Sequence, residues 1–136
     1  MPLIVPNVLE VEVLTTLLTP ALTMKLYGND ATPSASSSAA SFTEISGGGY
    51  ASKPLTFANW TISAGDPSTA VYNASQLWTF TGPIGGTGNI YGYFVTRNSD
   101  GKLMWAERFP SAVVPFAPIT GSKINVLPRF SAQSEF

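Results

Sequence analysis

The side chains best suited to acid–base chemistry are the eight carboxylates, because the chain contains neither histidine nor cysteine. Glu107 is the strongest candidate, since it alternates with Trp105 and Phe109 and is therefore predicted to be half-buried among aromatic rings, as a glycosidase acid would be. A glycosidase needs a second carboxylate roughly 5–10 Å away. The plausible partners all lie in predicted loops or short strands: Asp30, Glu44, Asp66 and Asp100. We favour an ion pair or a hydrogen-bonded anchor for Glu107 and predict that the chain is not an enzyme.

The missing residue types exclude several other chemistries. Without cysteine there is no thiolate nucleophile, disulfide or Cys-ligated zinc site, and without histidine there is no Ser-His-Asp triad. A metal would have only carboxylate and carbonyl oxygens as ligands, which suits calcium or magnesium. The loop aspartates Asp30, Asp66 and Asp100 lack the close spacing of a calcium-binding loop. We therefore expect neither a metal nor a cofactor.

Two other patterns have an ordinary structural interpretation. The glycines within residues 82–88 lack the Lys-Ser/Thr of a phosphate-binding loop, and no helical pattern follows them, so we interpret them and Gly47–Gly49 as turns. Three tryptophans and five tyrosines could build a sugar-stacking platform. Aromatic residues of a β-sandwich are more often core or interface, so carbohydrate binding is kept as an alternative only.

Charge is unusually scarce in this chain of 136 residues. Charged residues make up 11% against about 25% in an average soluble domain, and the net charge is −1. Scattered basic residues argue against nucleic-acid binding, and no apolar run has the roughly 18–20 residues that would span a membrane. The first residues lack the basic region of a secretory signal, so we expect synthesis in the cytoplasm without export. A surface this poor in charge favours burial against partners, and we expect a homo-oligomer.

Residues 7–18 are the one segment with helical spacing. Asn7 suits the N-cap position, and Glu10, three residues later, would complete a capping box. Alternating apolar and acidic residues over 9–13 leave a strand open as the alternative. We favour the helix because the run from Leu14 to Leu18 breaks that alternation. Four apolar residues would share its buried face: Val11, Leu14, Leu17 and Leu18.

The rest of the chain is predicted to consist of short strands separated by turns, which is typical of a sandwich or barrel. The clearest element is a hairpin closed by Asp100-Gly101, and Pro54 would have to lie on an edge strand. The predicted fold is all-β, a β-sandwich (jelly-roll-like) with one short N-terminal helix. Its parts are an N-terminal segment, 1–20, a sandwich domain, 21–131, and a tail, 132–136. The predicted strands are 21–27, 41–45, 50–55, 57–62, 70–80, 90–96, 102–109 and 122–131.

The order of several segments resembles a group of small structural proteins of tailed-bacteriophage virions. These segments are PNVLEVEVLTTLL, LTMKLYGND, GGGYASKPL, QLWTFTG, NIYGYFVTRNSDGKLMWAERFP and PFAPITGSKINVLPRFS. The resemblance covers nearly the whole chain, and none of its motifs is catalytic. It implies a capsid decoration (cement) protein located on the virion, often a trimer, that binds the major capsid protein or other virion proteins. A tail, fibre or baseplate module and a carbohydrate-binding β-sandwich are the alternatives.

Two segments are the candidates for docking onto such a partner, 1–18 and 110–120. Their apolar residues have no obvious place in the predicted core, although they could equally cover the ends of the sandwich. A decoration protein would use them to bridge neighbouring capsid subunits and add buried interface to the shell. The candidate partner-binding residues are Leu3, Ile4, Val5, Val113, Val114 and Phe116.

Overall fold

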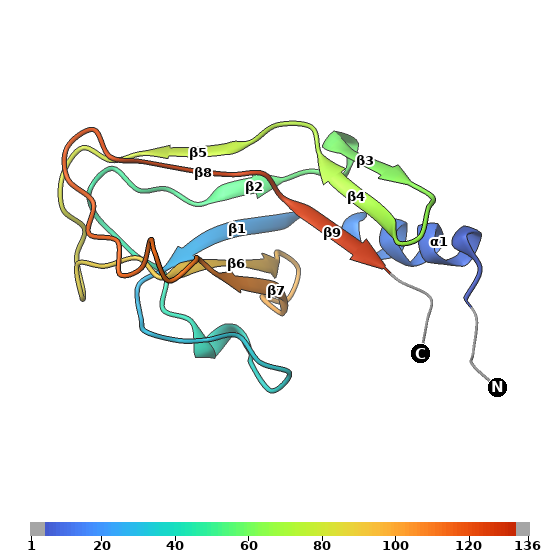
Figure 1. The fold of residues 1–136 in the computed structure, drawn as a ribbon, viewed down its shortest axis with the longest axis horizontal. Helices are drawn as coiled ribbons and strands as arrows, with labels where there is room; N and C mark the ends of the chain where they lie inside the picture. Colours follow the sequence, from blue (N-terminus) through green and yellow to red (C-terminus); the bar gives the residue numbers. More distant parts are fainter. Residues whose placement is uncertain (1–4, 133–136) are drawn as a thin grey trace. The chain divides into compact units, whose positions relative to one another are not determined.

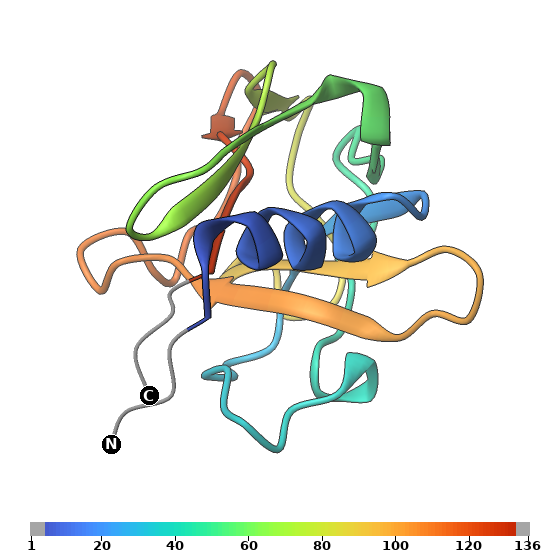
Figure 2. The same ribbon diagram turned by 90° about the vertical axis from the view of Figure 1, so that its right-hand side faces the viewer.

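The computed structural model describes residues 5–132, which are mostly β-structure with one short helix (Figures 1 and 2). None of the helices in this part of the chain is long and apolar enough to cross a membrane. Two single-turn 3₁₀ helices, Ala39–Ser41 and Phe57–Asn59, lie between the strands. The remaining elements, in chain order, are α1 Asn7–Leu18, β1 Leu22–Tyr27, β2 Lys53–Leu55, β3 Trp60–Ser63, β4 Ser68–Tyr72, β5 Gln76–Thr79, β6 Gly92–Arg97, β7 Leu103–Arg108, β8 Lys123–Val126 and β9 Arg129–Ala132.

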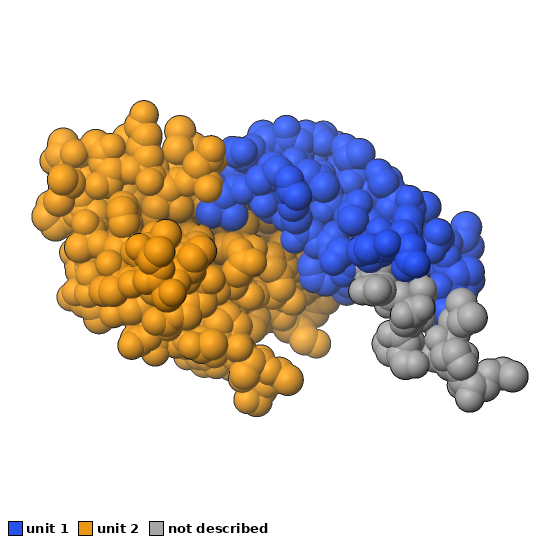
Figure 3. All heavy atoms as spheres, viewed as in Figure 1, with its two compact units in different colours: residues 1–21, 56–76, 126–136 blue, residues 22–55, 77–125 orange. Residues whose placement is uncertain are grey.

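The chain divides into two compact units, each assembled from segments that are distant in sequence (Figure 3). Unit 1 consists of residues 1–21, 56–76 and 126–136, and unit 2 of residues 22–55 and 77–125. Each unit therefore depends on long-range pairing, which a local sequence pattern does not reveal.

Unit 1 consists of α1 packed against the antiparallel sheet β3-β4-β9. The helix buries Leu14 and Leu18 completely, four residues apart and so on the same face. Alternate residues of β4 are buried in turn, with Ser68, Ala70 and Tyr72 on one face of the strand. The buried face of α1 and the buried face of β4 together form the core of unit 1.

The helix over 7–18 is confirmed, but the capping box is wrong. Pro6 occupies the N-cap position, and no side chain caps the helix. Glu10 is instead buried, and its Oε1 accepts a hydrogen bond of 2.7 Å from the hydroxyl of Ser68 on β4. A tertiary partner has therefore displaced the local one, because a buried carboxylate needs a donor more than a solvated helix end does.

Unit 2 contains an antiparallel sheet of order β2-β1-β6-β7 and a two-stranded sheet, β5-β8. Leu22, Met24 and Leu26 of β1 are fully buried, as their alternation predicted. The β6–β7 hairpin is confirmed, and Gly101 in its connection adopts a φ of 73° that favours glycine. Pro54 lies in β2 at the sheet edge, as expected for a residue without an N–H to donate.

An aromatic cluster attaches the long connection after β1 to the sheet. The ring centroids of Tyr27 and Phe42 are 4.7 Å apart, and those of Phe42 and Phe94 are 5.5 Å apart. The Tyr27 hydroxyl donates to the carbonyl of Ala31. Burial of Phe42 in this cluster therefore holds a Ser/Ala-rich loop that has no core residue of its own.

The predicted strand over 41–45 is wrong. Its first residue ends a 3₁₀ helix, and Glu44 forms only an isolated bridge with Tyr27. The side chain of Asn29 takes two of the backbone bonds here, since its amide donates to the carbonyl of Ser41 and its oxygen accepts from the N–H of Thr43. Main-chain pairing with the end of β1 is limited to two bonds, from the N–H of Gly28 to the carbonyl of Thr43 and from the N–H of Ile45 to the carbonyl of Leu26.

Three longer strand predictions are also wrong in their limits. The segment 70–80 contains the end of β4 and all of β5, which belong to different sheets and are separated at residues 73–75. The segment 122–131 is divided into β8 and β9 by Leu127-Pro128, where the Pro128 carbonyl accepts from the N–H of Tyr72. The segment 57–62 begins with a 3₁₀ turn, and its strand starts at Trp60. Proline and local turns override β-propensity in these places.

Replacing Phe42 with alanine should lower the free energy of unfolding by about 3–5 kcal/mol, because it removes a buried ring and leaves a cavity between Tyr27 and Phe94. Urea denaturation followed by fluorescence would measure the change. Phe57→Ala is the matched control, since the Phe57 ring is 41% exposed and its loss should cost about 1 kcal/mol or less. Equal losses in the two variants would contradict the role given to the cluster.

Candidate interaction surfaces

The segment 110–120, called the 110–120 loop below, presents apolar side chains without any charged residue. Ile119 is 67% and Val113 46% exposed, and Pro110, Pro115 and Ala117 are exposed beside them. An exposed cluster of this kind is typical of a binding surface.

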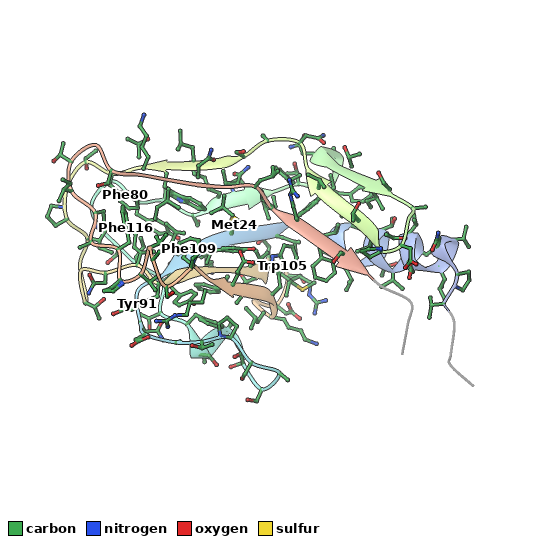
Figure 4. The ribbon with its side chains drawn as sticks, viewed as in Figure 1. Met24, Phe80, Tyr91, Trp105, Phe109 and Phe116 are labelled. Carbon is green, nitrogen blue, oxygen red and sulfur yellow. The ribbon has the colours of Figure 1, made fainter. Side chains whose placement is uncertain are left out.

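The 110–120 loop is held in place by backbone hydrogen bonds and not by charge. Ile90 and Phe116 exchange hydrogen bonds of 2.7 and 3.1 Å, and the N–H groups of Val113 and Val114 both donate to the carbonyl of Pro110. The side chain of Phe116 is half-buried (Figure 4). The loop therefore presents its exposed residues on a fixed backbone, which reduces the entropy lost on binding.

The predicted partner-binding residues differ in exposure. Val113 is exposed, whereas Val114 and Phe116 are half-buried, and the backbone of Phe116 pairs with Ile90 inside unit 2. Val5 is half-buried just before α1, in unit 1. Leu3 and Ile4 lie outside the described residues. Their role in binding stays a prediction, with Val113 the most accessible of the described members.

A second apolar surface lies on the outer side of α1, within the candidate docking segment 1–18, although none of its residues was among the predicted partner-binding residues. Val8 is 75% exposed, and Leu9 and Val13 are also exposed. A shallow groove of Leu9, Glu12, Val13, Thr16 and Leu17 runs along this side of the helix. The signal was present in the sequence, because a helix that is apolar on all sides has too little polar surface to face water.

A cleft of about 250 Å³ lies in unit 2, between the turn after β1 and the glycine-rich turn. Glu44 is the one charged residue among those that line it, and its carboxylate accepts a 2.6 Å hydrogen bond from the hydroxyl of Tyr50. The hydroxyl of Thr87 donates to the carbonyl of Gly28. Glu44 and Thr87 therefore each already have a hydrogen-bond partner within unit 2. The cleft residues are Gly28, Asn29, Thr43, Glu44, Ile45, Ser46, Gly85, Gly86 and Thr87.

The glycine-rich segments form turns, as predicted. Gly47, Gly48 and Gly49 have φ values of 82°, 60° and 79°, and Gly86 and Gly88 also lie in the positive-φ region. Residues that carry a side chain rarely adopt a positive φ, so the backbone geometry at these positions requires glycine.

The expectation of a half-buried Glu107 is wrong, because this residue is exposed on β7. Its neighbour Arg108 carries the ion pair in this region, with Nη1 2.6 Å from Oδ1 of Asp30 and 3.1 Å from the carbonyl oxygen of Ala31. The guanidinium also lies 5.2 Å from the ring centroid of Tyr91. Among residues 5–132, no three acidic side chains gather in a way that could hold a metal ion.

Three side chains have pKa values that their surroundings shift. Hydrogen bonds from the Arg97 guanidinium, and then from the N–H of Lys102, lower the pKa of Asp100 to about 2. Burial, and then the negative charge of Glu107, raises the pKa of Tyr93 to about 12. Burial likewise raises the pKa of Tyr50, with a further contribution from its hydrogen bond to Glu44. Asp100 stabilises the hairpin turn, and the tyrosines belong to packed regions.

The aromatic residues do not form a platform open to solvent. Trp60 and Trp78 are buried and Trp105 is half-buried, and each of the five tyrosines is buried or half-buried. The indole N–H of Trp78 donates to the carbonyl of Ala51 at 2.8 Å. The tryptophans and tyrosines therefore serve packing, and Figure 4 shows Trp105 and Tyr91 among the side chains of unit 2.

Comparison of the chain with models of known protein families, with curated proteins and with solved structures gave no match.

Raising the pH from about 10 through 12 should progressively destabilise the protein. Tyr93 has a pKa above its unfolded value in the folded state, so its neutral form contributes stability below pH 10 that is lost as the phenol ionises. Denaturant midpoints measured across this range, with phenolate absorbance recorded in parallel, would follow the loss. Tyr93→Phe should show a shallower decline, and an unchanged decline would contradict the assignment to Tyr93.

Proposed function

We propose that this chain is a structural protein of a tailed-phage virion that decorates and stabilises the capsid by binding the major capsid protein. The proposal combines the phage-like order of its segments with an apolar, charge-free binding surface. In this role the protein performs no reaction, and its contribution is the interface that it adds to the shell.

The 110–120 loop is the observation that carries the proposal. Val113 and Ile119 project from a backbone that hydrogen bonds to Ile90 and Thr81 already fix. Exposing such side chains to water is unfavourable for a monomer. Burying them against a partner contributes roughly 25 cal/mol of free energy for each Å² covered. The absence of charge in the loop avoids the desolvation cost that ionic groups would add at an interface.

Several symmetry-related copies of a weak contact would together bind the capsid with higher affinity than one copy. A stable interface buries about 800 Å² on each partner, and a single loop supplies only part of that area. A symmetric homo-oligomer would present several copies of the loop and gain from effective concentration. The outer side of α1 offers a further apolar surface for neighbouring subunits.

We infer that the two sheets of unit 2 form a jelly-roll-like sandwich. Met24 of the larger sheet and Trp78 of the smaller one are buried, which supports packed inner faces on both. Such a sandwich suits a decoration protein because its end loops are free to carry the binding residues.

The alternative virion positions are a tail, a fibre or a baseplate, where the same surfaces would bind different partners. Copy number separates them, since hundreds of copies on each particle indicate the head and a handful indicate the tail. A carbohydrate-binding sandwich is disfavoured, because the tryptophans and tyrosines that would stack on sugars are buried or half-buried.

Ile119→Asp and Val113→Asp should each weaken binding to phage particles assembled without this protein by about tenfold or more, because each places a charge in an apolar contact. Co-sedimentation with such particles would measure the affinity, and circular dichroism would confirm folding. Leu77→Asp is the control, since Leu77 is an exposed apolar residue of unit 2 outside the loop. Equal affinity of the loop variants and the wild type would overturn the proposal.

A further inference from the structure

The two edges of the four-stranded sheet are protected to very different degrees. β2 is three residues long and contains Lys53 and Pro54, both of which discourage strand pairing. β7 is six residues long, contains no proline, and has no strand on its other side among the described residues, although it carries Glu107, Arg108 and a bulge near its start. An edge strand of this length whose outer N–H and C=O groups have no strand partner is a template for pairing with another chain.

The register identifies which backbone groups of β7 face outward. The N–H of Phe109 donates to the carbonyl of Tyr91, on the β6 side. Because N–H and C=O directions alternate along an antiparallel strand, Glu107 and Trp105, which pair with Tyr93 and Val95, also face β6. The backbone groups of Ala106 and Arg108 therefore point away from β6.

The edge is already fixed in its extended form. Both oxygens of Asp100 bind the guanidinium of Arg97 at the hairpin turn, and Arg108 binds Asp30 at the far end of β7. A register shift opposite Val95 and Thr96 leaves Met104 as the bulged residue and Trp105–Arg108 as a regular ladder. A partner strand would meet a preformed surface, at little entropic cost.

We propose that β7 pairs with β7 of a second copy, antiparallel, across a two-fold axis at Ala106. This register places Trp105 opposite Glu107 of the second copy and Met104 opposite Arg108 of the second copy. No like charges are directly opposed, whereas a two-residue shift would bring the two Glu107 side chains together. This register therefore lets the edge pair with itself without opposing like charges, and a second copy is its occupant. The inference rests on the proposed function, for which it names one contact between copies.

The absence of cysteine in the chain makes a cross-linking test direct. In this register the two Ala106 residues form a hydrogen-bonded pair about 5.5 Å apart, within disulfide range. Ala106→Cys should therefore form a covalent dimer on mild oxidation, with a yield about tenfold above that of Ser99→Cys at the exposed hairpin turn. Equal yields from the two variants would overturn the proposal.

Ala106→Pro supplies the complementary test, because it removes an N–H that points away from β6 and spares the β6–β7 ladder. Wild-type protein should sediment as a dimer or a multiple of one, and this variant should dissociate about tenfold more readily. If the variant does not fold, the cross-linking yields decide the question alone. A wild-type monomer that still binds phage particles would overturn the strand pairing and leave the proposed function standing, whereas a dimer that binds no particle would do the reverse.

Discussion

The structure depends on one constraint: a surface with few charges must either be hydrated through uncharged polar groups or be buried against a partner. Residues 67–96 contain no charged side chain at all, and the 110–120 loop contains none either. Hydroxyl, amide and glycine backbone groups supply much of the polar surface in their place. Where no such polar group covers the surface, as at Val8 and Ile119, apolar side chains remain exposed. An interface is the physical solution that removes this exposed area from water.

Because charge is scarce, the loops are fixed by other means. Aromatic contacts of Tyr27, Phe42 and Phe94 hold the connection after β1, and the side chain of Asn29 bonds to its backbone at Ser41 and Thr43. The 110–120 loop uses reciprocal backbone bonds to Ile90. The ion pairs of Arg97 and Arg108 fix the two ends of β7. Rigid loops and a rigid edge strand suit the binding role that we propose for this protein.

Local patterns in the sequence predicted the elements that local chemistry determines. The helix over 7–18, the buried face of β1, the β6–β7 hairpin and the edge position of Pro54 follow from periodicity, turn chemistry and the missing proline N–H. The failures occurred where distant groups compete with local ones. Ser68 lies 58 residues from Glu10, yet it binds the carboxylate that a capping box would have used. Likewise, the exposure of Glu107 could not be predicted, because alternation shows which residues share a face of a strand but not what covers that face.

The candidate surfaces divide in the same way. The exposure of Val113 was predictable, since a charge-free, proline-rich segment with apolar residues favours neither a strand nor a place in the core. Half-burial of Phe116 was not, because its partner Ile90 precedes it by 26 positions and only the fold brings them together. Segment 1–18 was predicted to dock, but the predicted residues precede α1 and do not include those on its outer side. Its exposed Val8 and Val13 follow from the same helical spacing, read on the opposite side.

The most direct measurement of the central claim is hydrogen–deuterium exchange of the protein, free and bound to phage particles. If the protein works by burying charge-poor apolar surface, the amides of the 110–120 loop should exchange at least about tenfold more slowly on the particle. Those at the exposed Arg97–Gly101 turn should exchange at the same rate in both states. Equal exchange of the 110–120 loop in the free and bound protein would contradict the account.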